Sequence, residues 1–296
     1  MRYFMIKTNY HTHTFRCGHA NGDEEAMIKS AIDNKIEILG FSEHIPLPNY
    51  RYHILKGLPH TLKDINAFSV AIKTIITNGP SMRMPYSNKK FHLEEIKRLK
   101  RKYKDQITIY QGFEAEYFEE YLDYYQDLLS SKEIDYLILG NHFNRYAVHT
   151  CYYGKSNITN EEIISYKNDL LKAMDTNLFS YIAHPDLFMI GKGRFDDFCK
   201  NITQEICQKA LEKDIPLEIN AGGIRKGLCK IDDEMLYSYP NDHFFEIVGE
   251  MGCKVILGID AHDPNDYNDE IFETLNRFVN RHHLNIIDSF KFRKGK

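Results

Sequence analysis

The chain alternates short apolar runs with polar turns, and longer amphipathic stretches separate many of these units. Each run is rich in Ile, Leu, Val, Tyr or Phe, which is typical of parallel strands buried on both faces. The runs are 2–10, 35–42, 106–113, 135–141, 178–183, 215–220 and 253–259. A His, Asp, Glu or Asn residue stands at or just after the end of each run. The pattern therefore predicts seven strands that end in polar side chains.

Four stretches between these runs place apolar residues at helical spacing, namely 23–34, 92–104, 161–175 and 201–213. Alternation of strand and helix is typical of parallel βα units. A chain of 296 residues is also the usual length of a single α/β barrel. We therefore expect an α/β fold that forms one domain over residues 1–296.

Two segments do not fit the repeat. Residues 45–91 form an insertion after the second predicted strand, and several prolines punctuate it. We expect this insertion to be a long loop that shapes a substrate entrance. The tail 293–296, with the sequence RKGK, is expected to fray.

Composition narrows the function classes. Hydrophobic residues make up 43% of the chain and charged residues 27%, which argues against intrinsic disorder. The net charge of −4 argues against binding nucleic acid through bulk positive charge. We find no apolar run long enough for a signal peptide or a membrane span. The six cysteines are scattered without a CxxC pair, so we expect reduced thiols and a cytoplasmic location.

Potential metal ligands gather at the predicted strand ends. They are His11, His13, His44, Glu114, His142, His184, Asp260 and His262, and His19 lies in the first loop. In a parallel barrel the carboxyl ends of all strands open onto one face, so these side chains are expected to converge. Imidazole and carboxylate ligands together suit Zn, Mn or Fe. Nine candidates exceed the needs of one ion and indicate two or three divalent metals.

Spacing within the motifs supports convergence. His11 and His13 stand two apart, so on an extended strand both imidazoles point to the same side. Asp260 and His262 share this spacing. Each motif alone has an ordinary structural reading, since a loop or strand-end histidine needs no metal. The joint placement of all nine residues is what favours a metal cluster.

Two further assignments depend on position alone. Glu114 competes with Glu116 as a ligand, and we choose Glu114 because it lies at the strand end. The remaining histidines lack a strand-end position and are read as surface or core residues. Among them, His53 and His60 lie in the insertion and are candidates for substrate contact.

Short motifs along the chain add a resemblance to a known family. They are HTH with the following CGHA, then SEH, GFEAEYF, LGNHF, AHPDLF, LEIN and GIDAH. In this order, from about Tyr3 to His262, they resemble the polymerase-and-histidinol-phosphatase (PHP) family and, more narrowly, its histidinol-phosphatase branch. The RMP at 83–85 before an amphipathic helix is also typical of that branch. The resemblance implies a distorted (β/α)7 TIM-like barrel with a trinuclear metal site at the carboxyl ends of the strands.

The resemblance also implies a ligand set for each ion. The first ion would take His11, His13, Glu114 and Asp260; the second Glu114, His142 and His184; the third His19, His44 and His262. A metal-bridging hydroxide, held by the ions that Glu114 and Asp260 bind, would attack phosphorus. This chemistry suits a phosphate monoester, because divalent ions neutralise its oxygens and generate hydroxide near neutral pH. A low-pKa Cys17 thiolate, flanked by Arg16 and near His19, is the alternative nucleophile.

A phosphate group also needs basic or hydrogen-bonding partners. The candidates are Arg225, Arg194, Arg83, Ser42 and Asn141. Arg225 stands just past the sixth predicted strand and is our first choice, although an arginine in a solvated loop is an equal reading. Acids near the mouth would recognise the amine of histidinol, and Glu116, Glu218 and Asp186 are candidates for that role.

The predicted activity is hydrolysis of L-histidinol phosphate to L-histidinol and phosphate. Three alternatives remain at this point: a related phosphatase for another small phosphate ester, a phosphodiesterase or nuclease, and a non-catalytic metal-binding module. The acidic net charge weighs against the nuclease, and a full set of nine candidate ligands weighs against the module. The expected partner is a small phosphorylated metabolite, with neither nucleic acid nor membrane, and the sequence does not predict an oligomeric state.

Overall fold

The structure is a computed structural model that describes residues 6–77 and 82–295. Its strands are β1 (Thr8–Asn9), β2 (Ile38–Phe41), β3 (Thr108–Ala115), β4 (Tyr136–Leu139), β5 (Leu217–Asn220), β6 (Leu228–Ile231), β7 (Glu234–Tyr237), β8 (Lys254–Gly258) and β9 (Asn285–Ile286). Its longer helices are α1 (Glu24–Asp33), α2 (Tyr50–Gly57), α3 (Ile65–Thr77), α4 (Lys89–Lys102), α5 (Leu122–Ser130), α6 (Asn160–Thr176), α8 (Asp197–Lys213), α10 (Asp242–Glu250) and α11 (Asp269–Arg281).

Short helical segments complete the described chain. They are α7 (Met189–Lys192), α9 (Ala221–Arg225), and the 3₁₀ turns η1 (Phe15–Cys17), η2 (Leu58–Thr61), η3 (Tyr86–Asn88), η4 (Glu119–Tyr121), η5 (His149–Cys151) and η6 (Pro264–Asp266). None of the described helices is long and apolar enough to cross a membrane.

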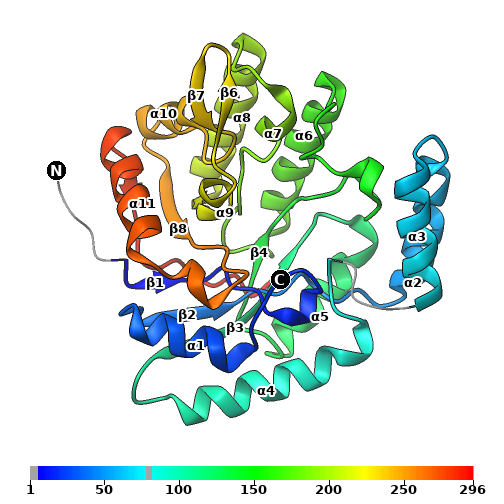
Figure 1. Cartoon of the computed structure of the whole chain (residues 1–296), viewed down its shortest axis with the longest axis vertical. Coiled ribbons are helices and arrows are strands. Elements are labelled where there is room, and N and C mark those ends of the chain that lie inside the picture. The colour runs from blue at the N-terminus through cyan, green and yellow to red at the C-terminus, as the bar shows by residue number, and fades with distance from the viewer. Residues whose placement is uncertain (1–5, 78–81, 296) are drawn as a thin grey trace.

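Parallel pairing organises the centre of the molecule (Figure 1). Strands β1, β2, β3 and β4 form one parallel sheet in chain order, and β5, β8 and β9 form a second. Single-residue bridges at Ile182 connect Leu139 of β4 to Leu217 of β5, and Thr12 bridges to Ala261 beyond β8. Helices pack around this curled arrangement, as in an α/β fold. The β6–β7 hairpin is antiparallel and lies apart from both sheets.

The sequence pattern locates most of these elements. Six of the seven predicted runs contain a parallel strand, and α1, α4, α6 and α8 occupy the four predicted helical stretches. The run 178–183 lies between β4 and β5 and shares backbone hydrogen bonds with both, but it forms bridges at Ile182 rather than a continuous strand before the backbone turns at His184. The β6–β7 hairpin and β9 were not predicted, since both are short and lack a strong apolar run.

The expectation of a long loop over 45–91 is wrong. This segment folds into α2, η2, α3 and η3, and the two helices pack against each other at one edge of the molecule (Figure 1). The prolines stand outside the helical interiors: Pro46 and Pro48 precede α2, and Pro59 lies in the first turn of η2. Pro80 lies outside the described residues. Proline at such positions begins or separates helices without breaking them.

Aromatic side chains fill the amino-terminal end of the sheet. The ring of buried Tyr136 occupies space left by Gly40 and Gly112. A Cβ at Gly40 would overlap the Tyr136 Oη atom, and one at Gly112 would lie 2.6 Å from the ring. This hydroxyl contacts the carbonyl oxygens of Tyr10 and Phe41 at 2.7 Å and 3.1 Å. The chain after β9 packs onto the same cluster through Phe290.

The tail is therefore anchored further than predicted. Phe292 stacks on Tyr136 with ring centroids 5.5 Å apart. The Arg293 guanidinium donates hydrogen bonds to Asn177 Oδ1 and to the carbonyl oxygens of Lys213 and Asp214. Fraying from residue 293 onward is thus wrong for Arg293 itself, and Lys296 lies outside the described residues.

Candidate metal centre

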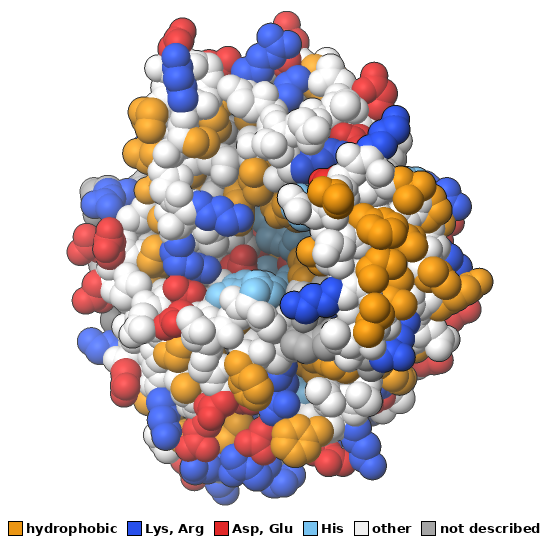
Figure 2. Space-filling model, turned by 45° about the vertical axis from the view of Figure 1, so that its right-hand side comes forward, with side chains coloured by type: hydrophobic (Ala, Val, Ile, Leu, Met, Phe, Trp, Pro, Cys, Tyr) orange, Lys and Arg blue, Asp and Glu red, His pale blue; other side chains and the backbone are white. Residues whose placement is uncertain are grey.

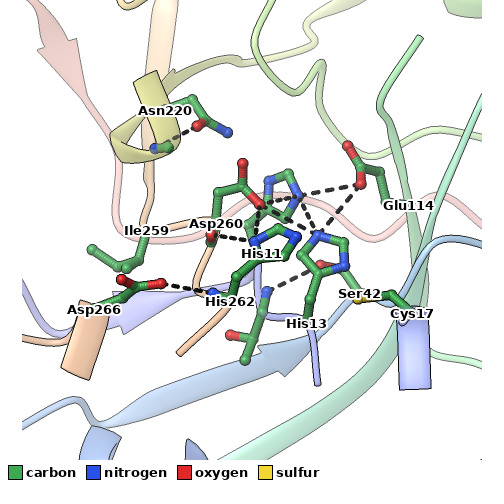
Figure 3. Close-up of polar contacts among 12 residues, drawn as sticks. His11, His13, Cys17, Ser42, Glu114, Asn220, Ile259, Asp260, His262 and Asp266 are labelled. Atoms are coloured by element: carbon green, nitrogen blue, oxygen red, sulfur yellow. Dashed lines mark hydrogen bonds and ion pairs between the residues drawn. The ribbon is translucent and has the colours of Figure 1, made fainter. Parts of the chain in front are cut away.

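The nine predicted ligands come together at the carboxyl ends of the parallel strands, and Figure 3 shows five of them, His11, His13, Glu114, Asp260 and His262. Strand β1 leads into His11 and His13, and β8 leads into Asp260 and His262. The remaining four strand-end residues are Glu114 in β3, His44 after β2, His142 after β4 and His184 after the Ile182 bridge. His19 reaches the group from the loop between η1 and α1. The predicted convergence of these side chains is what the structure shows.

One subset surrounds a common point. The Nε2 atoms of His11 and His13 lie 3.1 Å apart. Glu114 Oε2 is 3.5 Å from His11 Nε2 and 3.4 Å from His13 Nε2. Asp260 Oδ1 is 3.4 Å and 3.3 Å from the same two atoms. Two nitrogens and two carboxylate oxygens that face one another are a suitable donor set for Zn, Mn or Fe.

Glu114 also joins this subset to its neighbours. Its Oε1 atom lies 2.9 Å from His184 Nε2 and 3.5 Å from His142 Nε2. Its Oε2 atom lies 2.9 Å from His44 Nδ1. His44, Glu114 and His142 form a second group that could hold an ion. A single buried carboxylate therefore presents its two oxygens to different sets of imidazoles.

A third group lies nearer the surface. His262 Nε2 is 3.1 Å from His19 Nε2, and the ring centroids of His19 and His44 are 5.4 Å apart. His13, His44 and His262 also bring their ligand atoms within 4.8 Å of one another. The assignment of His19 to this set rests on the family resemblance, because a loop residue has no strand register that would fix its direction.

Carboxylates lie behind three of the histidines, and one of them holds its ring by a hydrogen bond. Glu218 Oε1 contacts His11 Nδ1 at 2.8 Å, and such a group keeps a metal-binding ring in place and strengthens its basicity. Glu116 Oε1 lies 3.6 Å from His142 Nδ1 and Glu43 Oε2 lies 3.9 Å from His13 Nδ1, which is close enough for charge interaction but too far for a hydrogen bond. The prediction that Glu116 and Glu218 recognise a substrate amine is wrong, because both are buried behind the histidines.

Glu43 was missed from the sequence, although its place in SEH beside His44 was a usable signal. Burial raises its pKa to about 8, against the hydrogen bond that it accepts from the Thr14 hydroxyl. Asp186, the third acid considered for the amine, is buried with its pKa raised to about 7 and accepts a hydrogen bond from Asn241 N at 2.6 Å. It does not line the cavity above the histidines.

Electrostatics favour the protonation states that metal ligands require at four of the candidate residues. Burial opposes ionisation of Glu114 and Asp260, but the surrounding histidines outweigh it and lower the pKa of both carboxyls well below the usual range. Burial lowers the pKa of His13 to about 3 and that of His44 well below 6.5. Nearby carboxylates outweigh burial and raise the pKa of His11 and His184, so these two rings would release a proton on binding an ion. Anionic carboxylates and neutral imidazoles are the forms that bind divalent ions. The residues present therefore fit a metal centre.

Backbone strain marks the same place. Asp260 and His184 adopt φ values of 51° and 32°, in the left-handed region that side chains other than glycine seldom occupy. Arg225 holds the first of these turns, because its guanidinium donates to the carbonyl oxygens of Ile259 at 2.7 Å and Asp260 at 2.5 Å. Its Nε also pairs with Asp266 at 3.3 Å. These contacts let Arg225 position Asp260, and the same side chain also lines the cavity.

The other predicted phosphate contacts are engaged elsewhere. Arg83 is buried and pairs with Glu116 at 2.7 Å, so it supports the residue behind His142. Arg194 is exposed and pairs with Asp196 at 3.1 Å, away from the cavity. Ser42 accepts a hydrogen bond from Thr12 N, and Asn141 accepts one from Tyr117 N. Neither lines the cavity, so these four predictions are wrong.

The cysteine alternative is also wrong. Burial raises the pKa of the Cys17 thiol to about 12, and its Sγ donates to Thr14 O at 3.2 Å. A buried thiol that stays protonated at neutral pH is a poor nucleophile. Of the two histidines of the insertion, His53 is buried and contacts Glu120 Oε1 at 2.6 Å, and neither it nor His60 lines the cavity.

A cavity of about 670 Å³ opens above the histidines. Figure 2 shows histidine side chains at the bottom of a hollow, with hydrophobic side chains gathered on one side of it. Lys226 lines this cavity, and its Nζ lies 4.9 Å from the centroid of the Tyr239 ring. Burial lowers the pKa of Lys226. Among the described residues its ammonium lies within ion-pair distance of no carboxylate. Sequence analysis missed it because Arg225 beside it was the stronger signal.

Comparison with known proteins places the chain in a family. Residues 9–222 match the model of the PHP domain. The chain belongs to the PHP family. A candidate histidinol-phosphatase from Deinococcus radiodurans is 21% identical to this PHP protein over 272 residues, which cover 86% of each chain.

Solved structures support the same fold. A candidate histidinol phosphatase from Listeria monocytogenes superposes with a TM-score of 0.66 at 20% identity, covering 89% of this chain and 98% of that one. Histidinol phosphate phosphatase from Lactococcus lactis, solved with zinc, L-histidinol and phosphate, gives a TM-score of 0.65 at 15% identity and covers 97% and 99% of the two chains. These likenesses establish a shared α/β architecture.

Proposed function

We propose that this PHP protein is a metal-dependent phosphomonoesterase that hydrolyses L-histidinol phosphate to L-histidinol and phosphate. The observation that carries the proposal is Glu114, whose two buried oxygens face different groups of imidazoles. A carboxylate so placed suits a bridge between two ions, the arrangement used in two-metal phosphate chemistry. The names of the relatives from Deinococcus and Lactococcus, and the ligands of the latter structure, support the choice of substrate.

The proposed ligand sets follow the three groups of side chains. They are His11, His13, Glu114 and Asp260 for the first ion; Glu114, His142 and His184 for the second; and His19, His44 and His262 for the third. Two or three ions of Zn, Mn or Fe suit this mixture of nitrogen and oxygen donors. When bound, such ions neutralise phosphate oxygens and supply hydroxide from water near neutral pH.

The protein side chains perform the remaining tasks. Glu114 and Asp260 remain anionic and oriented, the latter through the Arg225 guanidinium on its carbonyl. Glu218 holds the His11 ring through Nδ1, which directs Nε2 toward Glu114 and Asp260. Lys226 joins Arg225 as a proposed phosphate contact, since both line the cavity and the Lys226 ammonium lies beside Tyr239. A charged donor there would hold a phosphate oxygen.

Three features of the structure support proposals about barrel closure, domain organisation and cellular location. The bridges Leu139–Ile182, Ile182–Leu217 and Thr12–Ala261 support closure of the sheets into a distorted (β/α)7 barrel. The large hydrophobic core cluster draws residues from most elements, which supports one domain over 1–296 with an insertion at about 45–91. Six cysteines without a disulfide among the described residues suit a reducing cytoplasm.

Phosphate release is the direct test. The Mn-loaded and Zn-loaded proteins are assayed with L-histidinol phosphate, a panel of other phosphomonoesters and one phosphodiester, with chelator-treated protein as the control. We expect metal-dependent release with the highest kcat/KM for histidinol phosphate. Slow release from every monoester would contradict the substrate and retain the metallophosphatase. Faster turnover of the diester would overturn the proposed reaction class.

A further inference from the structure

The cavity has two chemically different halves. The histidines, Asp260 and Lys226 line one half, and helices α2 and α3 with the segment after β4 line the other. We call the second half the apolar arm; it is defined by Ile54, Ala67, Ala71, Phe143, Val148 and Leu187. The apolar arm begins where the metal centre ends, so a phosphate held at the ions would direct its ester group into the arm.

Helix α3 leaves the apolar arm open. Ala67, Ala71 and Thr74 face inward from α3 at helical spacing, and all three are buried and line the cavity. Two of its larger residues are strongly exposed, Ile65 at 81% and Ile76 at 72%, whereas Ile75 is half-buried against the core and Val70 lines the cavity. A helix that served only to close the core would bury its large side chains and expose its small ones. The inverse arrangement preserves empty apolar space beside the site.

The apolar arm has no partner for a cationic group. The only carboxylates among the described cavity-lining residues are Glu114 and Asp260, and both belong to the metal centre. Glu116 and Asp186 follow Glu114 and His184 by two residues, but both are buried outside the cavity lining. Glu116 is hydrogen-bonded to Arg83 and Asp186 to Asn241 N. The residues outside the described part, 1–5, 78–81 and 296, include no Asp or Glu. An ammonium group in the arm would lose hydration without gaining an ion pair.

We propose that the apolar arm binds the organic group of the phosphate ester as an uncharged, apolar body. The substrate class is then a phosphomonoester with an aromatic or aliphatic group, and an ammonium on that group contributes nothing to recognition. This inference rests on the proposed phosphomonoesterase activity and specifies what its site selects. The flat imidazole group of histidinol is largely neutral at pH 7.5 and so meets the requirement for an uncharged body.

The wild-type protein provides the first test. The metal-loaded enzyme is assayed with n-alkyl phosphates from ethyl to hexyl, and calorimetry measures binding of the matching alkylphosphonates. Burial of one methylene group is worth ~0.8 kcal/mol, so affinity and kcat/KM should rise about fourfold per carbon until the arm is full. A flat series with normal turnover would overturn the inference and leave the phosphatase. No turnover with any ester would refute the proposed function, while the phosphonate series would still test the arm.

A matched pair of esters tests the charge. L-histidinol phosphate is compared with its des-amino analogue, which keeps the imidazole and lacks the ammonium. We expect kcat/KM of the analogue to equal or exceed that of the amine. A loss of tenfold or more on removal of the amine would overturn the inference, because it would require an anionic partner in the site.

Two variants of α3 localise the effect. Ala71→Leu fills the apolar arm and should abolish the dependence of affinity and kcat/KM on chain length. Ser69→Leu adds the same side chain to an exposed position of the same helix and should leave the series unchanged. Retention of the full dependence in Ala71→Leu would contradict the placement of the ester group. The wild-type series stands whether or not this variant folds.

Discussion

The two ends of the parallel sheet differ in whether their buried polar atoms find hydrogen-bond partners within the protein. At the amino-terminal end, Tyr136 is surrounded by aromatic rings and its hydroxyl meets two carbonyl oxygens. At the carboxyl end, buried carboxylates and imidazoles crowd together, and the side-chain atoms His13 Nδ1, Glu43 Oε2 and His184 Nδ1 have no hydrogen-bond partner among the described residues. One end is satisfied by the protein alone, whereas the other has the donors and strain of a site completed by a ligand.

This difference shows where stability and function reside in the fold. Every second residue of a strand faces the same side of the sheet, so Tyr110 and Glu114 of β3 share one face. Tyr110 lies at the aromatic end and Glu114 at the candidate metal centre. Gly112 between them makes room for a neighbouring side chain, since a Cβ there would lie 2.6 Å from the Tyr136 ring. A few residues of strand therefore separate a packed apolar layer from a charged one. Substitutions at the two ends should have separable effects.

The largest effect is expected from Glu114→Gln. The amide keeps the shape of the side chain but loses the charge that faces both groups of imidazoles, so we expect kcat to fall by roughly 10³-fold or more. Metal content, measured by elemental analysis, should fall in parallel, and urea unfolding of the metal-free protein should change little. Near-normal turnover with full metal content would contradict a bridging role for this carboxylate.

Tyr136→Ala tests the aromatic, amino-terminal end of the sheet. Removal of a fully buried aromatic ring should lower the free energy of unfolding by about 3–5 kcal/mol, since the lost contacts and the cavity add together. Urea denaturation of the metal-free protein measures this change. The metal affinity of the fraction that remains folded should be retained. Loss of metal binding in a folded variant would show that the two ends are not independent.

The same comparison explains what the sequence could predict. Candidate ligands such as His11 and His13 can be placed together from the sequence because strand register and a fixed spacing determine where their side chains point. The contacts of Arg225 were not predictable, because the sequence indicates that a guanidinium is near the site but not that it donates to two carbonyl oxygens.

Residues that depend on long-range packing were harder to predict. The helical insertion was taken for a loop, because its prolines were visible whereas the packing of α2 on α3 was not. The apolar arm arises from that packing, and Ala67 and Ala71 gave no chemical signal. Sequence reasoning thus succeeds where local periodicity sets geometry and fails where a distant partner decides which group a side chain meets.

An intermediate effect is expected from Glu218→Gln. This residue contacts His11 Nδ1 and lies behind the ligand groups, so the variant should weaken metal affinity by about 10–100-fold, the usual range for such supporting groups. Competition with a chromophoric chelator measures the affinity. Glu37→Gln, which removes an exposed acid paired with Lys7, is the matched control and should change nothing. An unaltered affinity in Glu218→Gln would restrict this carboxylate to a packing role.

Tyr136→Phe should have the smallest effect, and it tests most directly whether the two ends of the sheet are independent. Tyr136→Phe keeps the ring and removes only the hydroxyl, which leaves the carbonyl oxygens of Tyr10 and Phe41 without that donor. We expect the free energy of unfolding to fall by about 1–3 kcal/mol, because buried acceptors lose their partner. Tyr10 is bonded directly to His11, so this hydroxyl connects the aromatic end to the first candidate ligand. If kcat and metal affinity stay within twofold of wild type, the layers act independently. A clear fall in metal affinity would instead show that the aromatic end positions the first ligand of the metal centre.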